Sequence, residues 1–166
     1  MRAVYLLLLA GLAVALAACG GSDAIELQWH DEHDSTLTLH DDHRQPLLRA
    51  DVSYLGRTPP DTDIEPGWQP GRTDFYRTTL YNLSPGLIEL QQIRHRMAKG
   101  PLLTKSAKDR AAIIADYGDY RLYPGHTLID RDSYVWARDD NSLHRLFMFT
   151  LDDIAYEVDL PLQYRP

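Results

Sequence analysis

The clearest candidates for chemistry in this sequence are four histidines in two short, similar segments. The segments read His-Asp-Glu-His and His-Asp-Asp-His, and they supply His30 with His33 and His40 with His43. Imidazole and carboxylate groups are ligands that suit zinc, copper or nickel. The sequence therefore offers a metal-binding hypothesis that rests on these four histidines.

The length of chain between the two segments limits that hypothesis. A strand over residues 35–39 would separate His33 from His40 by seven residues at about 3.3 Å each, so the segments would lie at opposite ends of the strand. Each segment would then form at most a site with two histidines, shared with a carboxylate such as Asp34. The interpretation that the pattern favours is a pair of polar hairpin turns whose acidic side chains face water.

Other reactive groups lack the patterns that catalysis requires. The sequence has no Gly-x-Ser-x-Gly motif and no glycine-rich phosphate loop. Carboxylate pairs occur at Asp130 with Asp132 and at Asp152 with Asp153, but both pairs fall at predicted turns, where solvated aspartates are expected. A hydrolase whose Ser, His and Asp meet in space without a local motif is the alternative. We expect a protein that is not an enzyme and has no cofactor.

The only cysteine of the chain, Cys19, lies at the end of an apolar N-terminal segment. A short positive n-region precedes a nearly continuous apolar h-region over residues 4–16, and two small residues follow it. The motif Leu16-Ala17-Ala18-Cys19 resembles the lipobox of bacterial lipoproteins. This resemblance implies that residues 1–18 are a signal peptide, that cleavage occurs just before Cys19, and that the cysteine receives lipid.

Two alternatives fit the N-terminal segment less well. A transmembrane anchor needs about 20 apolar residues, and the Gly-Gly-Ser-Asp segment over residues 20–23 ends the apolar run earlier. An ordinary secreted protein would leave Cys19 without a role. In the lipoprotein family an acidic residue directly after the cysteine retains the protein in the inner membrane, and here that residue is Gly20. The resemblance therefore implies an anchor in the outer membrane, on its periplasmic side, with the inner membrane as the alternative.

The charge of the chain restricts its partners. The full sequence has 17 basic and 24 acidic residues and a formal charge of −7. Removal of residues 1–18 takes away one arginine, which leaves a more acidic mature chain. Such a surface disfavours nucleic acid and anionic lipid, because both depend on clustered lysine and arginine. We expect membrane attachment through the lipid on Cys19 and an envelope protein or glycan as the partner.

The pattern of apolar residues predicts one domain built of short strands. After the signal peptide and a tether over residues 19–23, residues 24–166 have the length of a single domain. Apolar and polar residues alternate over many short segments, the longest of which runs from Ile154 to Tyr164. About eight strands without a parallel β-α-β rhythm indicate an antiparallel β-sandwich. The strand, turn, strand segment over residues 36–54 resembles immunoglobulin-like and transthyretin-like domains.

Two further segments carry specific expectations. One helix is predicted to begin with Ser106 as its N-cap, to run about three turns to Tyr117, and to end at Gly118. Its buried face would include Ala107 and Ile114, together with Ile113 and Tyr117. A basic spot that contains His95 is expected to be a solvated strand end.

The segment over residues 56–72 is predicted to be a long loop. It contains four prolines, which exclude a helix or an inner strand, and one aromatic residue, Trp68. Long loops in compact domains are often functional. Trp68 is therefore a candidate binding residue, but the interpretation that the pattern favours is a plug folded over the end of the sandwich.

Overall fold

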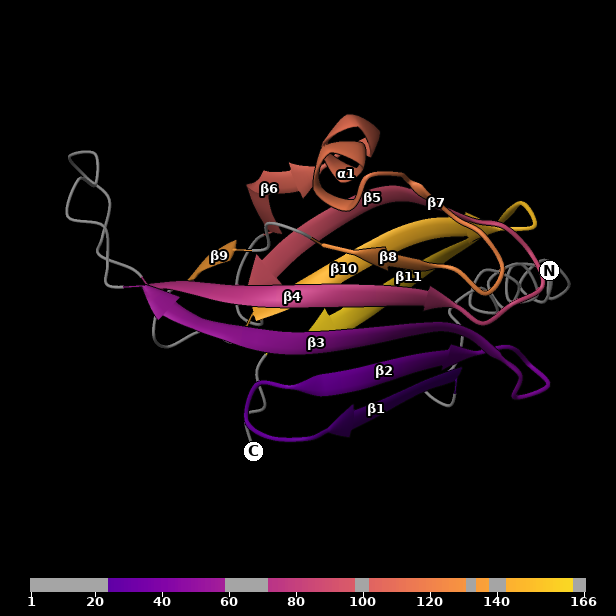
Figure 1. The fold of residues 1–166 in the computed structure, drawn as a ribbon, viewed down its shortest axis with the longest axis horizontal. Helices are drawn as coiled ribbons and strands as arrows, with labels where there is room; N and C mark the ends of the chain where they lie inside the picture. Colours follow the sequence, from indigo (N-terminus) through magenta and orange to yellow (C-terminus); the bar gives the residue numbers. More distant parts are fainter. Residues whose placement is uncertain (1–23, 59–71, 98–101, 131–133, 138–142, 163–166) are drawn as a thin grey trace, which may run out of the picture.

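The protein is mainly β, with two antiparallel sheets that enclose one hydrophobic core (Figure 1). The computed structural model describes residues 24–58, 72–97, 102–130, 134–137 and 143–162. A β-sandwich with one short helix is thereby confirmed. The immunoglobulin-like or transthyretin-like type stays a prediction.

Each sheet has a simple strand order. The first sheet follows the order β1-β2-β3-β4-β8, and β9 also pairs with β4. The second sheet follows the order β11-β10-β5-β6, and β7 also pairs with β5. The strands of the first sheet are β1 (Ile25–Trp29), β2 (Ser35–His40), β3 (Pro46–Thr58), β4 (Arg72–Asn82), β8 (Thr127–Ile129) and β9 (Tyr134–Ala137). Those of the second are β5 (Ile88–Met97), β6 (Leu102–Lys108), β7 (Arg121–Leu122), β10 (Leu143–Leu151) and β11 (Ile154–Pro161), and the helix is α1 (Arg110–Tyr117).

Alternation along the strands builds the core. Every second residue of β2 is buried, and β10 follows the same rule with one further buried residue. These residues meet across the sandwich because successive side chains of a strand point to opposite faces. Large fully buried apolar side chains come from both sheets and from the helix, and they include Leu37, Leu48, Leu80, Leu90, Ile113, Phe147 and Phe149.

The turn between β10 and β11 is a two-residue hairpin turn. Asp152 and Asp153 have φ angles of 50° and 63°. Positive φ at both central positions is the geometry that matches the twist of the flanking strands. Both aspartates are exposed, so the predicted solvated turn at this pair is confirmed.

The loop predicted to begin at residue 56 begins later in the structure. β3 continues to Thr58, because a bulge between Tyr54 and Gly56 lets the pairing with β4 resume beyond it. Gly56 has a φ of 120°, a conformation that glycine adopts without strain. Trp68, the candidate binding residue, lies outside the described residues.

The helix is shorter than predicted and has a different cap. α1 begins at Arg110 because β6 occupies the chain up to Lys108, and Asp109 accepts a hydrogen bond from the backbone of Ala112 at 3.0 Å. Gly118 ends the helix with a φ of 89°, as predicted. Ile113 and Tyr117 are buried, as predicted, whereas Ala107 and Ile114, also expected to be buried, are exposed.

No helix in the described part of the chain is long and apolar enough to cross a membrane.

The position of the cap can be tested by substitution. Asp109→Ala should lower the free energy of unfolding by about 1 kcal/mol, because one N–H of the first turn loses its acceptor. Urea denaturation measures this loss. Ser106→Ala is the matched control, since Ser106 is the cap that the sequence predicts. A larger loss for Ser106→Ala than for Asp109→Ala would contradict the observed cap.

Candidate functional site

The first histidine pair lies at the turn between β1 and β2. Asp31 forms this turn: its carboxylate accepts from the backbone N–H groups of His33 at 2.7 Å and of Asp34 at 2.6 Å. These bonds hold the pKa of Asp31 below its usual value, because they stabilise the ionised carboxylate. The His33 ring stacks on Tyr54, with 4.1 Å between the ring centroids. The predicted polar turn is confirmed here.

The second pair lies at the turn between β2 and β3 and repeats this arrangement. Asp41 accepts from the backbone N–H groups of His43 at 2.8 Å and of Gln45 at 2.7 Å. In both segments, therefore, the aspartate after the first histidine builds the turn through backbone contacts. This role explains the aspartate that follows the first histidine in each segment.

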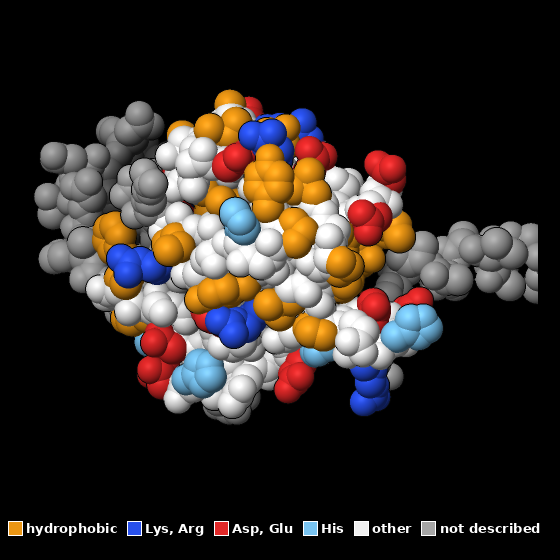
Figure 2. Space-filling view, turned by 45° about the vertical axis from the view of Figure 1, so that its right-hand side comes forward, with side chains coloured by type: hydrophobic (Ala, Val, Ile, Leu, Met, Phe, Trp, Pro, Cys, Tyr) orange, Lys and Arg blue, Asp and Glu red, His pale blue; other side chains and the backbone are white. Residues whose placement is uncertain are grey.

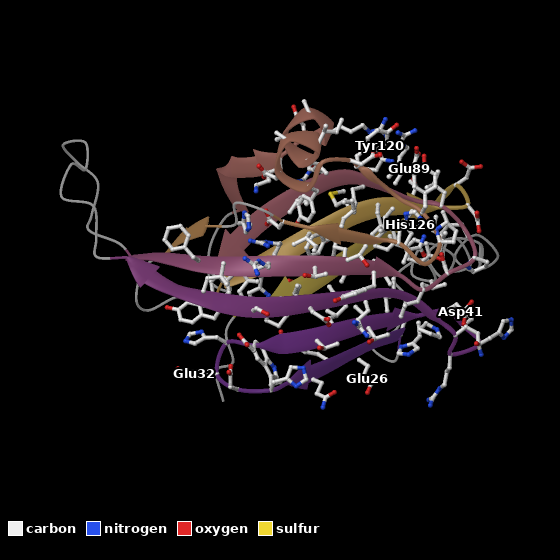
Figure 3. All side chains as sticks on the ribbon, viewed as in Figure 1. Glu26, Glu32, Asp41, Glu89, Tyr120 and His126 are labelled. Carbon is white, nitrogen blue, oxygen red and sulfur yellow. The ribbon has the colours of Figure 1, made fainter. Side chains whose placement is uncertain are left out.

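The two pairs are far apart, as the sequence predicts. β2 separates the two turns, and six residues of strand span about 20 Å. Glu32 and Asp41 mark the opposite ends in Figure 3. Asp34, the carboxylate expected to share a site, accepts from the backbone N–H of Tyr54 at 2.7 Å. The described residues contain no group of three or more His, Cys, Asp or Glu side chains that could hold a metal, and a weaker site with two histidines stays a prediction.

Carboxylates surround the β1–β2 hairpin. Residues 24–46 contain six acidic residues and one basic residue, Arg44, which gives a formal charge of −5 with the histidines neutral. We call the six acidic residues the acidic rim; they are Glu26, Asp31, Glu32, Asp34, Asp41 and Asp42. Figure 2 shows acidic and histidine side chains along the lower margin of the molecule, the side on which β1 and β2 lie in Figure 1. The acidic rim is therefore a candidate surface for binding.

A second cluster of polar side chains lies inside the sandwich. Its centre is Arg145 of β10, whose side chain is 1% exposed. The guanidinium donates to His95 Nε2 at 2.9 Å, to Thr78 Oγ1, and to Asp130 Oδ2 at 3.3 Å. The hydroxyl of Tyr117 donates to the same Asp130 oxygen at 3.4 Å. The cluster thus joins the first sheet, the second sheet and the helix.

The chemistry of this cluster is internal. Every side-chain nitrogen of Arg145 carries a proton, so its guanidinium can only donate. His95 must therefore accept through Nε2. A histidine that accepts through Nε2 is neutral and has its proton on Nδ1. Asp130 balances the charge of Arg145. Burial raises the pKa of Tyr117 well above its usual range, with the Asp130 carboxylate adding to the effect and Arg145 opposing it. Because all five side chains are buried, they do not meet a substrate in this conformation.

Two predictions from the sequence are wrong at this cluster. His95 is buried instead of lying at a solvated strand end, and Asp130 is buried instead of lying at a solvated turn. Arg145 is not among the candidate residues predicted from the sequence.

A signal for Arg145 is present in the sequence. The inward positions of β10 hold Leu, Arg, Phe, Phe and Leu, so the alternation places Arg145 in the core between apolar residues. The signal for His95 is weaker. A register shift of β5 against β10 at Gln91 interrupts the alternation between Leu90 and Ile93, and His95 faces inward only after that shift.

The other predicted site residues lie outside the described part of the chain. Among them are Cys19 and the signal peptide over residues 1–18.

Comparison with known proteins finds no family model that matches the sequence and no curated protein with significant similarity to it. The site must therefore be interpreted from its own residues.

The buried charge pair can be tested by removing one member. Arg145→Ala should lower the free energy of unfolding by about 3–5 kcal/mol, because Asp130 is left as an uncompensated buried charge. Urea denaturation measures the loss. The double variant Arg145→Met with Asp130→Asn should recover part of it, since no buried charge remains. Arg121→Ala, on the surface, is the control and should leave the midpoint nearly unchanged. If the two substitutions lowered the free energy of unfolding independently, so that the double variant lost the sum of both, the coupling between the Arg145 and Asp130 charges would be contradicted.

The buried tyrosine predicts a dependence of stability on alkaline pH. Above about pH 10 an unfolded chain ionises its tyrosines, whereas folded Tyr117 keeps its proton, because its pKa is raised. The unfolded state then binds fewer protons, so stability falls as pH rises, by up to about 1.4 kcal/mol per pH unit for this group. Tyr117→Phe should make the fall between pH 10 and pH 11.5 shallower. Tyr123→Phe, at an exposed tyrosine, should not; equal slopes for the two variants would contradict this role of Tyr117.

Proposed function

We propose that the protein is an envelope lipoprotein, anchored by lipid on Cys19 and acting as a non-enzymatic binding module in a larger assembly. The observation that carries this proposal is the position of the only cysteine, directly after the small residues that end the apolar segment. The residue after the cysteine is not acidic, which favours the outer membrane on its periplasmic side. The partner is then an envelope protein or glycan.

The short tether supports a role close to the membrane. Five peptide units join Cys19 to Ala24, where the described domain begins, and they span at most about 18 Å. β1 follows at once, so the first strand and the acidic rim would lie near the lipid headgroups. A partner of this surface would therefore be reached at the membrane.

The internal cluster around Arg145 supports a binding module more than a hydrolase. Its histidine and aspartate are the residue types that a hydrolase uses, but both are held against an arginine inside the sandwich. Their contacts account for them as parts of the packing between the two sheets.

Lipid attachment can be tested with the full chain expressed in a bacterium that has an outer membrane. Cys19→Ser should abolish incorporation of labelled palmitate and release the protein from the membrane fraction, because the thiol is the acceptor of the lipid. Gly20→Ser is the matched control and should leave both unchanged. Gly20→Asp should move the lipidated protein to the inner membrane.

Retention of Cys19→Ser in the membrane fraction would contradict the proposal. It would indicate that the apolar segment over residues 4–16 is itself the anchor.

A further inference from the structure

His95 of β5 and Arg145 of β10 form a pair of side chains inside the sandwich. They lie directly opposite one another on paired strands, and both side chains are buried. Nε of Arg145 donates to Nε2 of His95 at 2.9 Å. This bond uses the lone pair on Nε2, which a protonated imidazole does not have. The bond between the two side chains therefore exists only while His95 is neutral.

One carboxylate balances the charge of this pair. Among the described residues, the buried side chains that can carry a charge at acid or neutral pH are His95, Arg145 and Asp130. Asp130, after β8, accepts from Nη1 of Arg145 at 3.3 Å. α1 faces the same carboxylate with Tyr117, whose hydroxyl keeps its proton because burial raises its pKa. The negative charge of Asp130 thus offsets the positive charge of Arg145.

The other elements packed against His95 bring no second carboxylate among the described side chains. β4 contributes Thr78, which is uncharged, and on β6 the pairing partner of His95 is Leu103. Arg94, the residue before His95, lies on the opposite face of β5 and donates to Gln92. A proton on His95 would therefore place two cations against one carboxylate in the core.

Such a proton affects more than one element of the fold. An uncompensated buried charge is strongly destabilising, and the proton also converts Nε2 from an acceptor into a donor that faces the guanidinium. Arg145 then loses its position, and its bonds to Thr78 and Asp130 are those that hold β4 and the segment after β8. Tyr117 extends the same cluster to α1. Protonation of one imidazole is thus transmitted to both sheets and to the helix.

We propose that His95 is an acid-sensitive latch between the two sheets, closed while its imidazole is neutral and opened by proton uptake. In the open state the bond between Arg145 and His95 is broken, and the contacts of Arg145 with the first sheet loosen. The latch requires only the folded domain. It therefore goes beyond the proposed binding role and does not depend on lipid attachment.

Proton binding sets the direction of the effect. Histidines of an unfolded chain take up a proton near pH 6.5, whereas folded His95 stays neutral below that pH for as long as it accepts from Arg145. Below about pH 6.5 the unfolded chain therefore binds more protons than the closed, folded chain. Stability falls as pH falls, by up to about tenfold in the folding equilibrium constant per pH unit for this group.

Urea denaturation of the full chain in detergent, at pH 7.5, 6.5 and 5.5, tests the latch. His95→Gln is the test variant, because a glutamine oxygen can accept from Arg145 but does not titrate. The matched control is His126→Gln, at an exposed histidine (Figure 3). Between pH 6.5 and pH 5.5 we expect the folding equilibrium constants of the wild-type chain and of His126→Gln to fall up to about tenfold more than that of His95→Gln.

NMR of the imidazole nitrogens gives a second readout on the unaltered chain, which decides the matter even if His95→Gln does not fold. Spectra that correlate ring protons with ring nitrogens distinguish the two neutral tautomers from the imidazolium. We expect His95 to carry its proton on Nδ1 at pH 7.5 and to stay neutral at pH 5.5, where exposed His126 is charged. At lower pH, conversion of His95 to the imidazolium should coincide with changes in the amide signals of Arg145 and Thr78.

Three results would overturn the inference. Equal slopes of stability against pH for the wild-type chain and His95→Gln would show that His95 does not set the response to acid. Titration of His95 together with His126, with the amide signal of Arg145 unchanged, would show that the core accepts the second cation. A proton on Nε2 of His95 at pH 7.5 would exclude the bond to Arg145 on which the latch depends.

Discussion

The fold depends on the hydrogen-bond and charge partners of one buried cation, the guanidinium of Arg145. Arg145 lies between the sheets, and removing its charge from water costs several kcal/mol unless partners replace the water. The partners come from β5, β4, the segment after β8 and, through Asp130, from α1. Each of these elements must be in place for the others to be stable. The cluster therefore fixes the relative position of the two sheets in a way that apolar packing alone does not, since apolar contacts are not directional.

The sequence predicts the fold class because alternation along a strand is a local property. β2, β10 and the Asp152–Asp153 turn follow from residue type and spacing within a few positions. The errors occur where distant parts of the chain decide the outcome. Ser106 is a good N-cap residue by type, but β6 occupies that segment through its pairing with β5, so the cap moves to Asp109. The bulge before Gly56 likewise depends on the pairing of β3 with β4.

The candidate sites show the same division. The turns at His30–His33 and at His40–His43 were predictable, because their hydrogen bonds connect residues that are two to four positions apart. The Arg145 cluster was not, because His95 and Arg145 are 50 residues apart in sequence. Aspartate and histidine are usually solvated, and only the tertiary structure reveals that they are buried here. The order of the strands was also not predictable, since the neighbours of a strand in a sheet are not a local property of the sequence.

The strand order has a consequence for how the chain folds. β1 to β4 are neighbours both in sequence and in the first sheet, so their pairings close shorter connections than the pairing of β5 with β10 does. The central pairing of the second sheet joins β5 to β10, and it closes a much longer loop at a greater entropic cost. Contacts of high sequence separation slow folding. The pairing of β10 with β5 also withdraws Arg145 from water, so we expect this pairing and the completion of the polar cluster to occur together. We therefore expect the second sheet to fold cooperatively.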